Sequence, residues 1–233
     1  MLALPKEKAR AVQLRKQGKT YGEIAKQILV SKSTLSLWLR DVEVSAEFLS
    51  RIRQKKLDAV KKGWEARRKE RIDRTKQITD AAREEVSKFY KQPLWLVGVT
   101  LYWAEGHKEK SWRPGALVTF TNMDENTIII FRNWCRKYMD VSDGDFVYSL
   151  YVHATHEMRT LEIKQWWARK LSINPDSIAV YYKKHTTKHV RHNDDDNYHG
   201  VCRVRVRKSV DMNRRIASWT SEMVRSLEDK NKL

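Results

Sequence analysis

Residues 45–91 are the segment that most restricts how this chain can fold. They contain no proline and a single glycine, Gly63, within a dense mixture of Lys, Arg, Glu and Asp. Proline and glycine weaken a helix more than other residues, so their near absence favours helix throughout the segment. Its apolar residues recur too sparsely for a sustained coiled coil. The segment therefore predicts one or two long, basic, solvated helices. We interpret residues 45–92 as a linker between a domain at 1–44 and a domain at 93–233.

The charge of the chain favours a polyanionic partner. Its 233 residues carry a formal net charge of +18, which exceeds what solubility requires and is typical of proteins that bind nucleic acid. Residues 1–92 hold 24 Lys and Arg against 12 Asp and Glu, so most of the surplus lies there. The basic linker could lie along a nucleic-acid backbone, and a spacer with a solvated charged face is the equal alternative.

The same composition bears on the compartment. No apolar run approaches the roughly 18–20 residues of a membrane-spanning helix, and the short apolar opening of the chain is too brief for a signal peptide. Two cysteines, Cys135 and Cys202, make no disulfide framework. We therefore expect a cytoplasmic protein, encoded by a bacterium or phage, with no membrane partner.

Residues 5–42 predict three short helices. Thr20 stands where an N-cap is expected, with Glu23 at the spacing of a capping box, and Ser31 caps the third helix. Residues 18–25 (Gly-Lys-Thr-Tyr-Gly-Glu-Ile-Ala), followed by residues 30–35 (Val-Ser-Lys-Ser-Thr-Leu), resemble the helix-turn-helix of resolvase-type and repressor-type proteins.

That resemblance implies that the third helix enters the major groove of DNA. The small side chain of Ala25 would let the second helix approach the third closely. The residues expected to reach base edges and phosphates are Lys32, Ser33, Thr34, Ser36 and Arg40. A three-helix packing module without a role in DNA binding is the alternative.

Residues 93–233 predict an α+β domain with four strands and helices on one face. We expect helices at 94–105, 124–138, 158–171 and 209 to about 227, and strands at 116–121, 145–153, 177–184 and 200–207. Cys135 and the pair Trp166 and Trp167 are expected in the core. In the last strand, Arg203, Arg205 and Arg207 alternate with valines and would face DNA, with a solvated sheet face as the alternative.

The helix at 94–105 ends in an unusual way. It is nearly all apolar, yet it closes on one acid, Glu105, followed by Gly106. The helix dipole disfavours a carboxylate at a helix C-terminus by ~0.3–1 kcal/mol. A divalent cation would account for the acid, because Mg²⁺ binds hard oxygen ligands, usually including one or two carboxylates.

Residues 98–106 (Gly-Val-Thr-Leu-Tyr-Trp-Ala-Glu-Gly) resemble the LAGLIDADG motif of homing endonucleases in the form that ends in Glu-Gly. Residues 120–124 (Phe-Thr-Asn-Met-Asp) and 200–206 (Gly-Val-Cys-Arg-Val-Arg-Val) resemble bacterial and phage proteins that join a helix-turn-helix to a LAGLIDADG-like domain. The resemblance covers most of the chain.

The resemblance implies a DNA endonuclease that depends on Mg²⁺ or Mn²⁺. Two motif helices would pack side by side below a saddle of β-strands, and their acids would hold metals at the scissile phosphates. Glu105 would be the catalytic metal ligand, with Gly106 beside it. The helix contact would be lined by Gly98, Thr100, Leu101 and Ala104. One motif per chain implies a homodimer on double-stranded DNA that reads a pseudo-palindromic site.

Departures from the motif leave the enzymatic activity open, although we lean towards it. The usual acid is aspartate, and Trp103 is bulky. Lys108 is the nearest candidate for the assisting lysine, and the alternatives are Lys183, Lys184 and Lys188; Lys183 and Lys188 are also expected to contact DNA. A related class of sporulation regulators has this fold beside a helix-turn-helix and does not cleave DNA. A non-cleaving transcriptional regulator or recombination accessory protein is therefore the alternative.

A histidine-rich connection precedes the last expected strand. It contains His185, His189, His192 and His199, and the pairs His189/His192 and His199/Cys202 have spacings that could bind zinc. No four-ligand pattern of standard spacing is present. We therefore do not expect zinc, and we interpret the connection as a polar loop that touches DNA phosphates.

Overall fold

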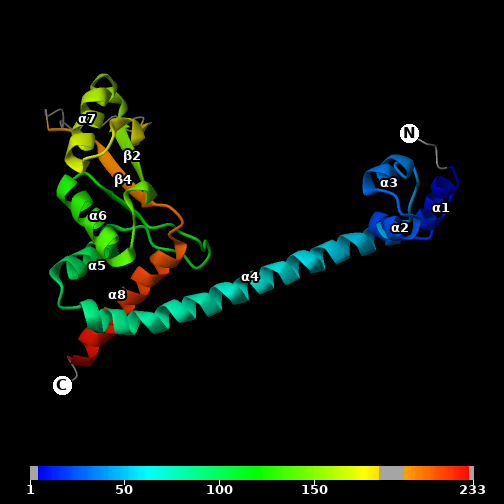
Figure 1. Cartoon of the computed structure of the whole chain (residues 1–233), viewed down its shortest axis with the longest axis horizontal. Coiled ribbons are helices and arrows are strands. Elements are labelled where there is room, and N and C mark those ends of the chain that lie inside the picture. The colour runs from blue at the N-terminus through cyan, green and yellow to red at the C-terminus, as the bar shows by residue number, and fades with distance from the viewer. Residues whose placement is uncertain (1–4, 184–196, 231–233) are drawn as a thin grey trace. The chain divides into compact units, whose positions relative to one another are not determined.

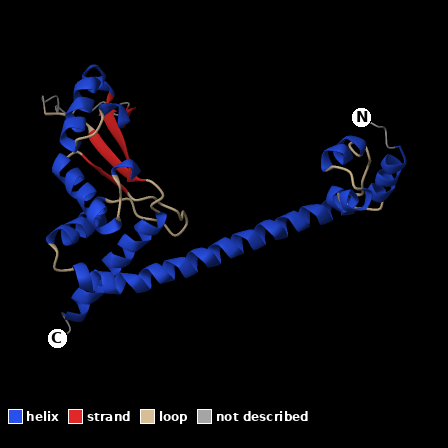
Figure 2. Cartoon of the chain, viewed as in Figure 1, coloured by secondary structure: helices blue, strands red, loops and turns tan. Residues whose placement is uncertain are grey.

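In the computed structural model, the described residues are 5–183 and 197–230, and they have the α+β architecture expected from the sequence. This part of the chain contains eight α-helices and one four-stranded mixed sheet (Figures 1 and 2). The chain divides into two compact units, Met1–Arg71 and Ile72–Leu233. The division falls within the long basic segment, so each unit includes one part of that segment.

The first unit contains α1 (Pro5–Lys16), α2 (Tyr21–Ile28), α3 (Lys32–Trp38) and the start of α4 (Ala46–Phe89). The Thr20 hydroxyl accepts a hydrogen bond from the Glu23 amide (3.3 Å), and the Glu23 carboxylate accepts one from the Thr20 amide (2.8 Å). The predicted capping box of α2 is therefore confirmed. Ser31 caps α3 by accepting the Thr34 amide at 3.1 Å. A small core holds the helices together through Ala11, Ile24, Leu35 and Leu39.

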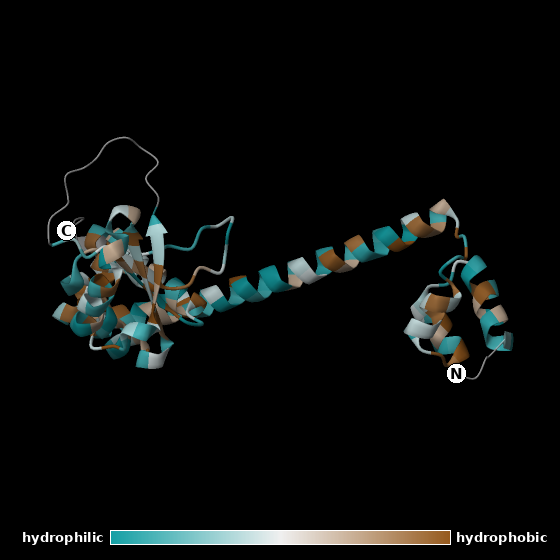
Figure 3. Ribbon diagram, turned by 90° about the horizontal axis from the view of Figure 1, so that it is seen from above, coloured by the Kyte–Doolittle hydropathy of each residue, from teal (hydrophilic) through white to brown (hydrophobic). Residues whose placement is uncertain are grey.

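The long basic segment forms one continuous helix, α4. Its first turns pack in the first unit, where Phe48 is buried and Arg51 donates a hydrogen bond to the Gly18 carbonyl (2.8 Å). Its last turns contribute Ala82 and Val86 to the core of the second unit. The intervening turns are mostly exposed, and polar and apolar residues alternate along the ribbon of Figure 3.

The second unit adds four helices and four strands to the end of α4. In chain order these are α5 (Pro93–Glu105), β1 (Thr119–Asn122), α6 (Glu125–Met139), β2 (Phe146–His153), α7 (Thr160–Leu171), β3 (Ile178–Lys183), β4 (Val201–Val206) and α8 (Val210–Lys230). Short 3-10 helices lie at Asp143–Asp145, Ala154–Arg159 and Pro175–Ser177.

Two elements begin two or more residues later than the sequence predicts. β1 begins at Thr119 rather than 116, and the preceding Val118 bonds through its amide to the Ser209 hydroxyl (2.8 Å) and through its carbonyl to the Val206 amide (2.9 Å). α7 begins at Thr160 rather than 158, because the preceding 3-10 helix has a non-helical residue, His156, with φ −105° and ψ 18°.

The sheet has the strand order β1-β4-β2-β3. β2 and β3 are parallel, and the other two pairs are antiparallel. Burial alternates along β2 and β4, so that Cys202, Val204 and Val206 point into the core. One sheet face is therefore packed against helices (Figure 2), and the side chains on the opposite face of β2 and β4 are half-buried or exposed within the described residues.

Tryptophan dominates the core of the second unit. Four tryptophans are fully buried there: Trp95, Trp134, Trp167 and Trp219. The Trp219 ring lies 5.5 Å from Trp95 and 6.1 Å from Trp134, centroid to centroid. Cys135 is buried among them, as predicted, and burial raises the pKa of its thiol. Trp166 is only partly buried and stacks on His199. This core fixes α5 against α6 and α8, and so determines where the end of α5 projects.

Candidate nucleic-acid interface

α5 has two apolar faces. Its buried face consists of Trp95, Gly98, Val99 and Tyr102. Its exposed face includes Val97, Thr100, Trp103 and Ala104, with Val97 and Trp103 about half exposed at 48% and 51%. No described residue of the chain covers this second face. A helix that is apolar on both faces is normally buried on both.

Gly98 lies on the buried face of α5. A Cβ at this position would come within 3.0 Å of three ring atoms of Trp134 in α6. Gly98 was expected at a contact between two motif helices, and it instead permits the close approach of α5 and α6 within one chain. Thr100 and Ala104 are exposed and accessible on the other face, whereas Leu101 is half-buried and packs against the core.

The end of α5 leaves one carboxylate in solvent. Glu105 is the last residue of the helix and is exposed. The Gly106 amide donates to the Tyr102 carbonyl (2.8 Å), and a Cβ on Gly106 would collide with the Tyr102 ring and carbonyl. The φ of Gly106 is −72°, so close packing, and not a left-handed backbone, requires glycine here.

The loop that follows α5 is anchored at its start. The His107 carbonyl accepts hydrogen bonds from the Tyr102 hydroxyl (2.7 Å) and from the side-chain amide of Asn213 (3.0 Å). Burial raises the pKa of Tyr102 well above its usual range, so its hydroxyl remains a donor. Glu109 pairs with Arg214 of α8 at 3.2 Å, and both side chains are largely buried. The loop is therefore held to the body of the second unit by both polar and ionic contacts.

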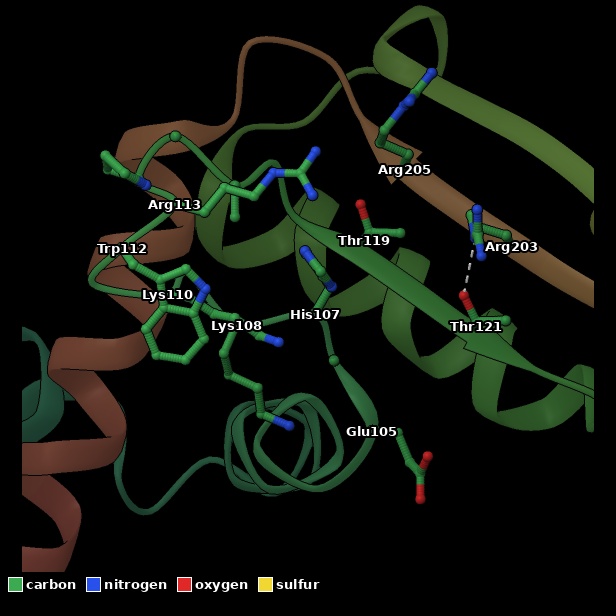
Figure 4. Close-up of a pocket in the computed structure, with 14 residues that line it drawn as sticks. Glu105, His107, Lys108, Lys110, Trp112, Arg113, Thr119, Thr121, Arg203 and Arg205 are labelled. Carbon is green, nitrogen blue, oxygen red and sulfur yellow. Dashed lines mark hydrogen bonds between the residues drawn. The ribbon is translucent and has the colours of Figure 1, made fainter.

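A pocket of about 730 Å³ lies between this loop, the end of α5 and the open face of β1 and β4. Five cationic side chains line it: Lys108, Lys110, Arg113, Arg203 and Arg205. Glu105 is the only acid among the described residues of the lining. Figure 4 shows Trp112 and Lys110 on one side of His107, and Arg203 and Arg205 on the other. Such a lining attracts anions, and phosphate groups above all.

Lys108 does not reach the Glu105 carboxylate. Its ammonium donates to the Ala104 carbonyl (3.1 Å) and so satisfies a backbone acceptor at the C-terminus of α5. Figure 4 shows the Glu105 carboxylate directed away from His107 and Lys108. Lys183 lies elsewhere on the sheet, with its ammonium 5.7 Å from the centre of the Tyr151 ring. Lys184 and Lys188 lie outside the described residues.

The open sheet face is polar and partly aromatic. Arg203 lies between Thr121 and Ser149 on the neighbouring strands, and it donates to the Thr121 hydroxyl (3.3 Å) and to the Tyr151 hydroxyl. Tyr151 stacks on Tyr181 with ring centres 5.4 Å apart. Arg203 is thus held in place by its neighbours, which fixes the direction of its remaining N–H groups.

The predicted alternation of arginines along β4 is observed for two of the three residues. Arg203 and Arg205 point away from the core, and Arg205 is exposed beside Thr119. Arg207 is exposed but follows the end of the strand. Arg205, Arg113 and Lys110 make no ion pair with any carboxylate in residues 5–183 and 197–230. Their charges are therefore available to a bound anion.

The residues expected to read DNA in the first unit lie on or just after α3. Lys32, Ser33, Ser36 and Arg40 are exposed, and Thr34 is half-buried. The hydroxyl of Ser31 lies 2.7 Å from that of Ser33 and 2.9 Å from that of Thr34. The cap of α3 therefore orders the hydroxyls at its N-terminus. Leu29 is the C-cap of α2; it is 92% exposed and adopts the left-handed conformation (φ 55°).

Of the residues considered for zinc, only His199 and Cys202 lie in the described part of the chain. His185, His189 and His192 lie outside the described residues. The His199 ring stacks on Trp166 with 3.8 Å between ring centres, and Cys202 is fully buried on the core side of β4. Within the described ranges, no group of three or more His, Cys, Asp or Glu side chains is arranged to hold a metal ion.

Sequence reasoning missed much of the pocket. His107, Lys110, Trp112, Arg113 and Thr119 line it, although none was singled out from the sequence. A signal was present, since residues 107–113 combine an aromatic side chain with four basic or imidazole groups. Only the pairing of β1 with β4 brings that segment to Arg203 and Arg205.

Comparisons with protein-family models, with curated proteins and with solved structures found no match to this chain. No helix among the described residues has the combined length and apolar character that spanning a membrane requires. The functional interpretation of the chain therefore depends on the residues and geometry above.

Proposed function

We propose that this protein binds double-stranded DNA at specific sites and cleaves it as a homodimeric, metal-dependent endonuclease of LAGLIDADG type. The observation that carries the proposal is the pocket beside Glu105. There a solvent-exposed carboxylate borders five cationic side chains that come from one loop and one strand. Binding and cleavage of a phosphodiester use both the cations and the carboxylate, because cations hold the phosphate oxygens and a carboxylate can hold a divalent metal.

Two surfaces contribute to DNA binding in this proposal. The first is a helix-turn-helix formed by α2 and α3, with Lys32, Ser33, Ser36 and Arg40 facing the major groove. The capping of both helices supports this assignment, because it sets where α2 and α3 each begin. The second surface is the open sheet face, on which Arg203 and Arg205 would contact the backbone.

The pocket fits a divalent cation only in part. One protomer supplies a single carboxylate, Glu105, and the adjacent Gly106 carbonyl is a possible further oxygen ligand. Mg²⁺ is commonly held by one or two carboxylates together with substrate phosphates, so the donor set is adequate once DNA and a second protomer are present. A bound metal would supply water activation and stabilisation of the leaving oxygen. Arg113, Arg205 and Lys110 would hold the flanking phosphates.

The exposed face of α5 supports a homodimer. Val97, Thr100, Trp103 and Ala104 form an apolar surface on the helix that ends in Glu105. Pairing this face with the same face of a second protomer would bury those side chains and bring two Glu105 residues towards one DNA duplex. The small side chains of Thr100 and Ala104 would permit close approach, and the Trp103 ring would lie at the margin.

A non-cleaving regulator remains the second candidate, and one observation favours it. No lysine reaches the Glu105 carboxylate among the described residues, because Lys108 is engaged by the Ala104 carbonyl. The regulator would use the same two DNA-binding surfaces and bind sites without nicking them.

The decisive experiment incubates the protein with a randomised plasmid library and either Mg²⁺ or Mn²⁺. Cleavage by the wild type and by Glu65→Gln, with none by Glu105→Gln, supports the enzyme. Glu65 is a matched control because it is an exposed acid on α4 that does not line the pocket. Site-selective binding without nicks in all three proteins overturns cleavage in favour of the regulator. Absence of selective binding overturns both candidates.

A further inference from the structure

We propose that Trp112 stacks on a nucleobase that has left the DNA helix, and that the pocket beside Glu105 holds that nucleotide. The inference rests on the proposed DNA-binding function and deepens it. The DNA is read with one base unstacked, and Trp112 receives that base.

Trp112 stands at the corner of a tight turn. The Arg113 amide donates to the Lys110 carbonyl (2.9 Å), so Ser111 and Trp112 occupy the two central positions of a β-turn. The Trp112 side chain is 79% exposed, more than any other aromatic side chain in the described part of the chain. Tryptophan is highly buried on average, so an indole held out at a loop tip requires an explanation.

The turn is supported by fixed contacts. The His107 carbonyl accepts two hydrogen bonds, and its amide donates to the Thr119 carbonyl (2.9 Å). Glu109 is paired with Arg214, and their side chains are only 20% and 12% exposed. The loop therefore presents Trp112 from an anchored base. A loop held in this way loses less backbone conformational entropy when its tip binds a partner.

The surroundings of the indole match a nucleotide. The Lys110 ammonium lies 5.4 Å from the Trp112 ring centre, and Arg113 is the next residue in the chain. The one acid of this turn region, Glu109, is neutralised by Arg214. Aromatic rings that receive bases, combined with cations that receive phosphates, are the usual means of binding unpaired nucleic acid.

The pocket favours an extruded base over an intact duplex. In a duplex, both faces of each internal base are covered by its neighbours, so a protein ring stacks on a base either by wedging between two base pairs or after that base leaves the stack. Trp112 lines the same pocket as Glu105, Arg203 and Arg205. The volume of the pocket, about 730 Å³, lies within the usual range for small-molecule sites. An apolar protein partner fits less well, because cations surround the ring.

The test compares a short, fully paired DNA duplex with the same duplex carrying one unpaired nucleotide. A third probe replaces that nucleotide by an abasic residue. We expect the wild type to bind the duplex with the unpaired base on the order of tenfold more tightly than the paired duplex, the gain of about one base–aromatic stack. The abasic probe should lose this gain. When 2-aminopurine is the unpaired base, its fluorescence should be quenched on binding.

The variants assign the effect to the ring. Trp112→Ala should remove both the preference and the quenching, and Trp112→Phe should keep most of each. Trp64→Ala is the matched control, since Trp64 on α4 is 66% exposed, and it should leave the affinity ratio unchanged. The inference is overturned if Trp112→Ala keeps the preference, or if the abasic probe binds as tightly as the probe with a base.

The outcomes separate this inference from the proposed function. Equal binding of all three DNA probes by the wild type overturns the stacking role and leaves duplex binding intact. Loss of binding to every DNA probe overturns the proposed function and this inference together. A stronger preference for the same probes made of RNA overturns the assignment to DNA.

Discussion

Replacement of Gly98 by alanine is expected to destabilise the second unit. The new Cβ would come within 3.0 Å of three Trp134 ring atoms, whereas favourable carbon contacts lie at ~3.5–4.0 Å. The Trp134 ring cannot easily move, because it is fully buried and lies against Trp219, Phe131 and Tyr102. The overlap should therefore cost ~3 kcal/mol, the upper end of the usual range for overpacking.

Part of this cost is offset by helix propensity. Alanine is favoured over glycine in a helix interior by ~1 kcal/mol, which leaves a net loss of ~2 kcal/mol. For a domain of this size, that loss corresponds to a decrease in Tm of roughly 4–8 °C. Thermal unfolding followed by near-ultraviolet circular dichroism measures it, because the signal comes from the tryptophan-rich core. Thr100→Ala is the control on the exposed face and should change stability by less than ~0.5 kcal/mol.

A second variant tests the cause. Trp134→Phe removes part of the indole, so Gly98→Ala should cost less in that background than in the wild type. The reasoning is refuted if Gly98→Ala unfolds at the wild-type temperature, or if its cost is the same in both backgrounds. If Gly98→Ala instead changes self-association and leaves monomer stability unchanged, Gly98 lies at the contact between the α5 helices of two protomers.

Three further predictions concern other parts of the molecule. Thr20→Ala removes the side-chain half of the capping box and should destabilise the first unit by ~1 kcal/mol in thermal unfolding; an unchanged Tm would contradict it. Lys32→Ala should weaken duplex binding and reduce the steepness of log binding constant against log salt concentration by about 1, because one phosphate contact is lost. A slope equal to that of the wild type would show that Lys32 does not contact a phosphate. Burial raises the pKa of the Cys202 thiol to about 12, against ~8.5 in an unfolded chain. Between these pH values only the unfolded state loses the proton, so stability is full below pH ~8.5 and falls as pH rises, by up to ~1.4 kcal/mol per pH unit. Denaturant unfolding at several alkaline pH values should show that Cys202→Ala has a shallower decline; parallel declines would refute this assignment.

Local patterns in the sequence predicted the elements well. The capping box at Thr20, the end of α5 at Glu105 and the alternation along β4 each depend on residues within a few positions of one another. Helix caps and the two-residue period of a strand are set by local hydrogen bonds and side-chain direction. The sequence therefore determined the order of helices and strands, the α+β class and the arginine-bearing face of β4.

Long-range packing decided the rest. The role of Gly98 depends on Trp134, and the target of Lys108 depends on how α5 ends. The pocket requires β1 to pair with β4, which joins Thr121 to Arg203 across a long interval of chain. No local pattern encodes such a pairing, because it arises from burial of the whole core. The sequence thus determined that the chain carries an acid at a helix end and an excess of basic residues. The tertiary structure alone decided which of those basic residues line the pocket beside the acid, and that Trp112 stands exposed among them.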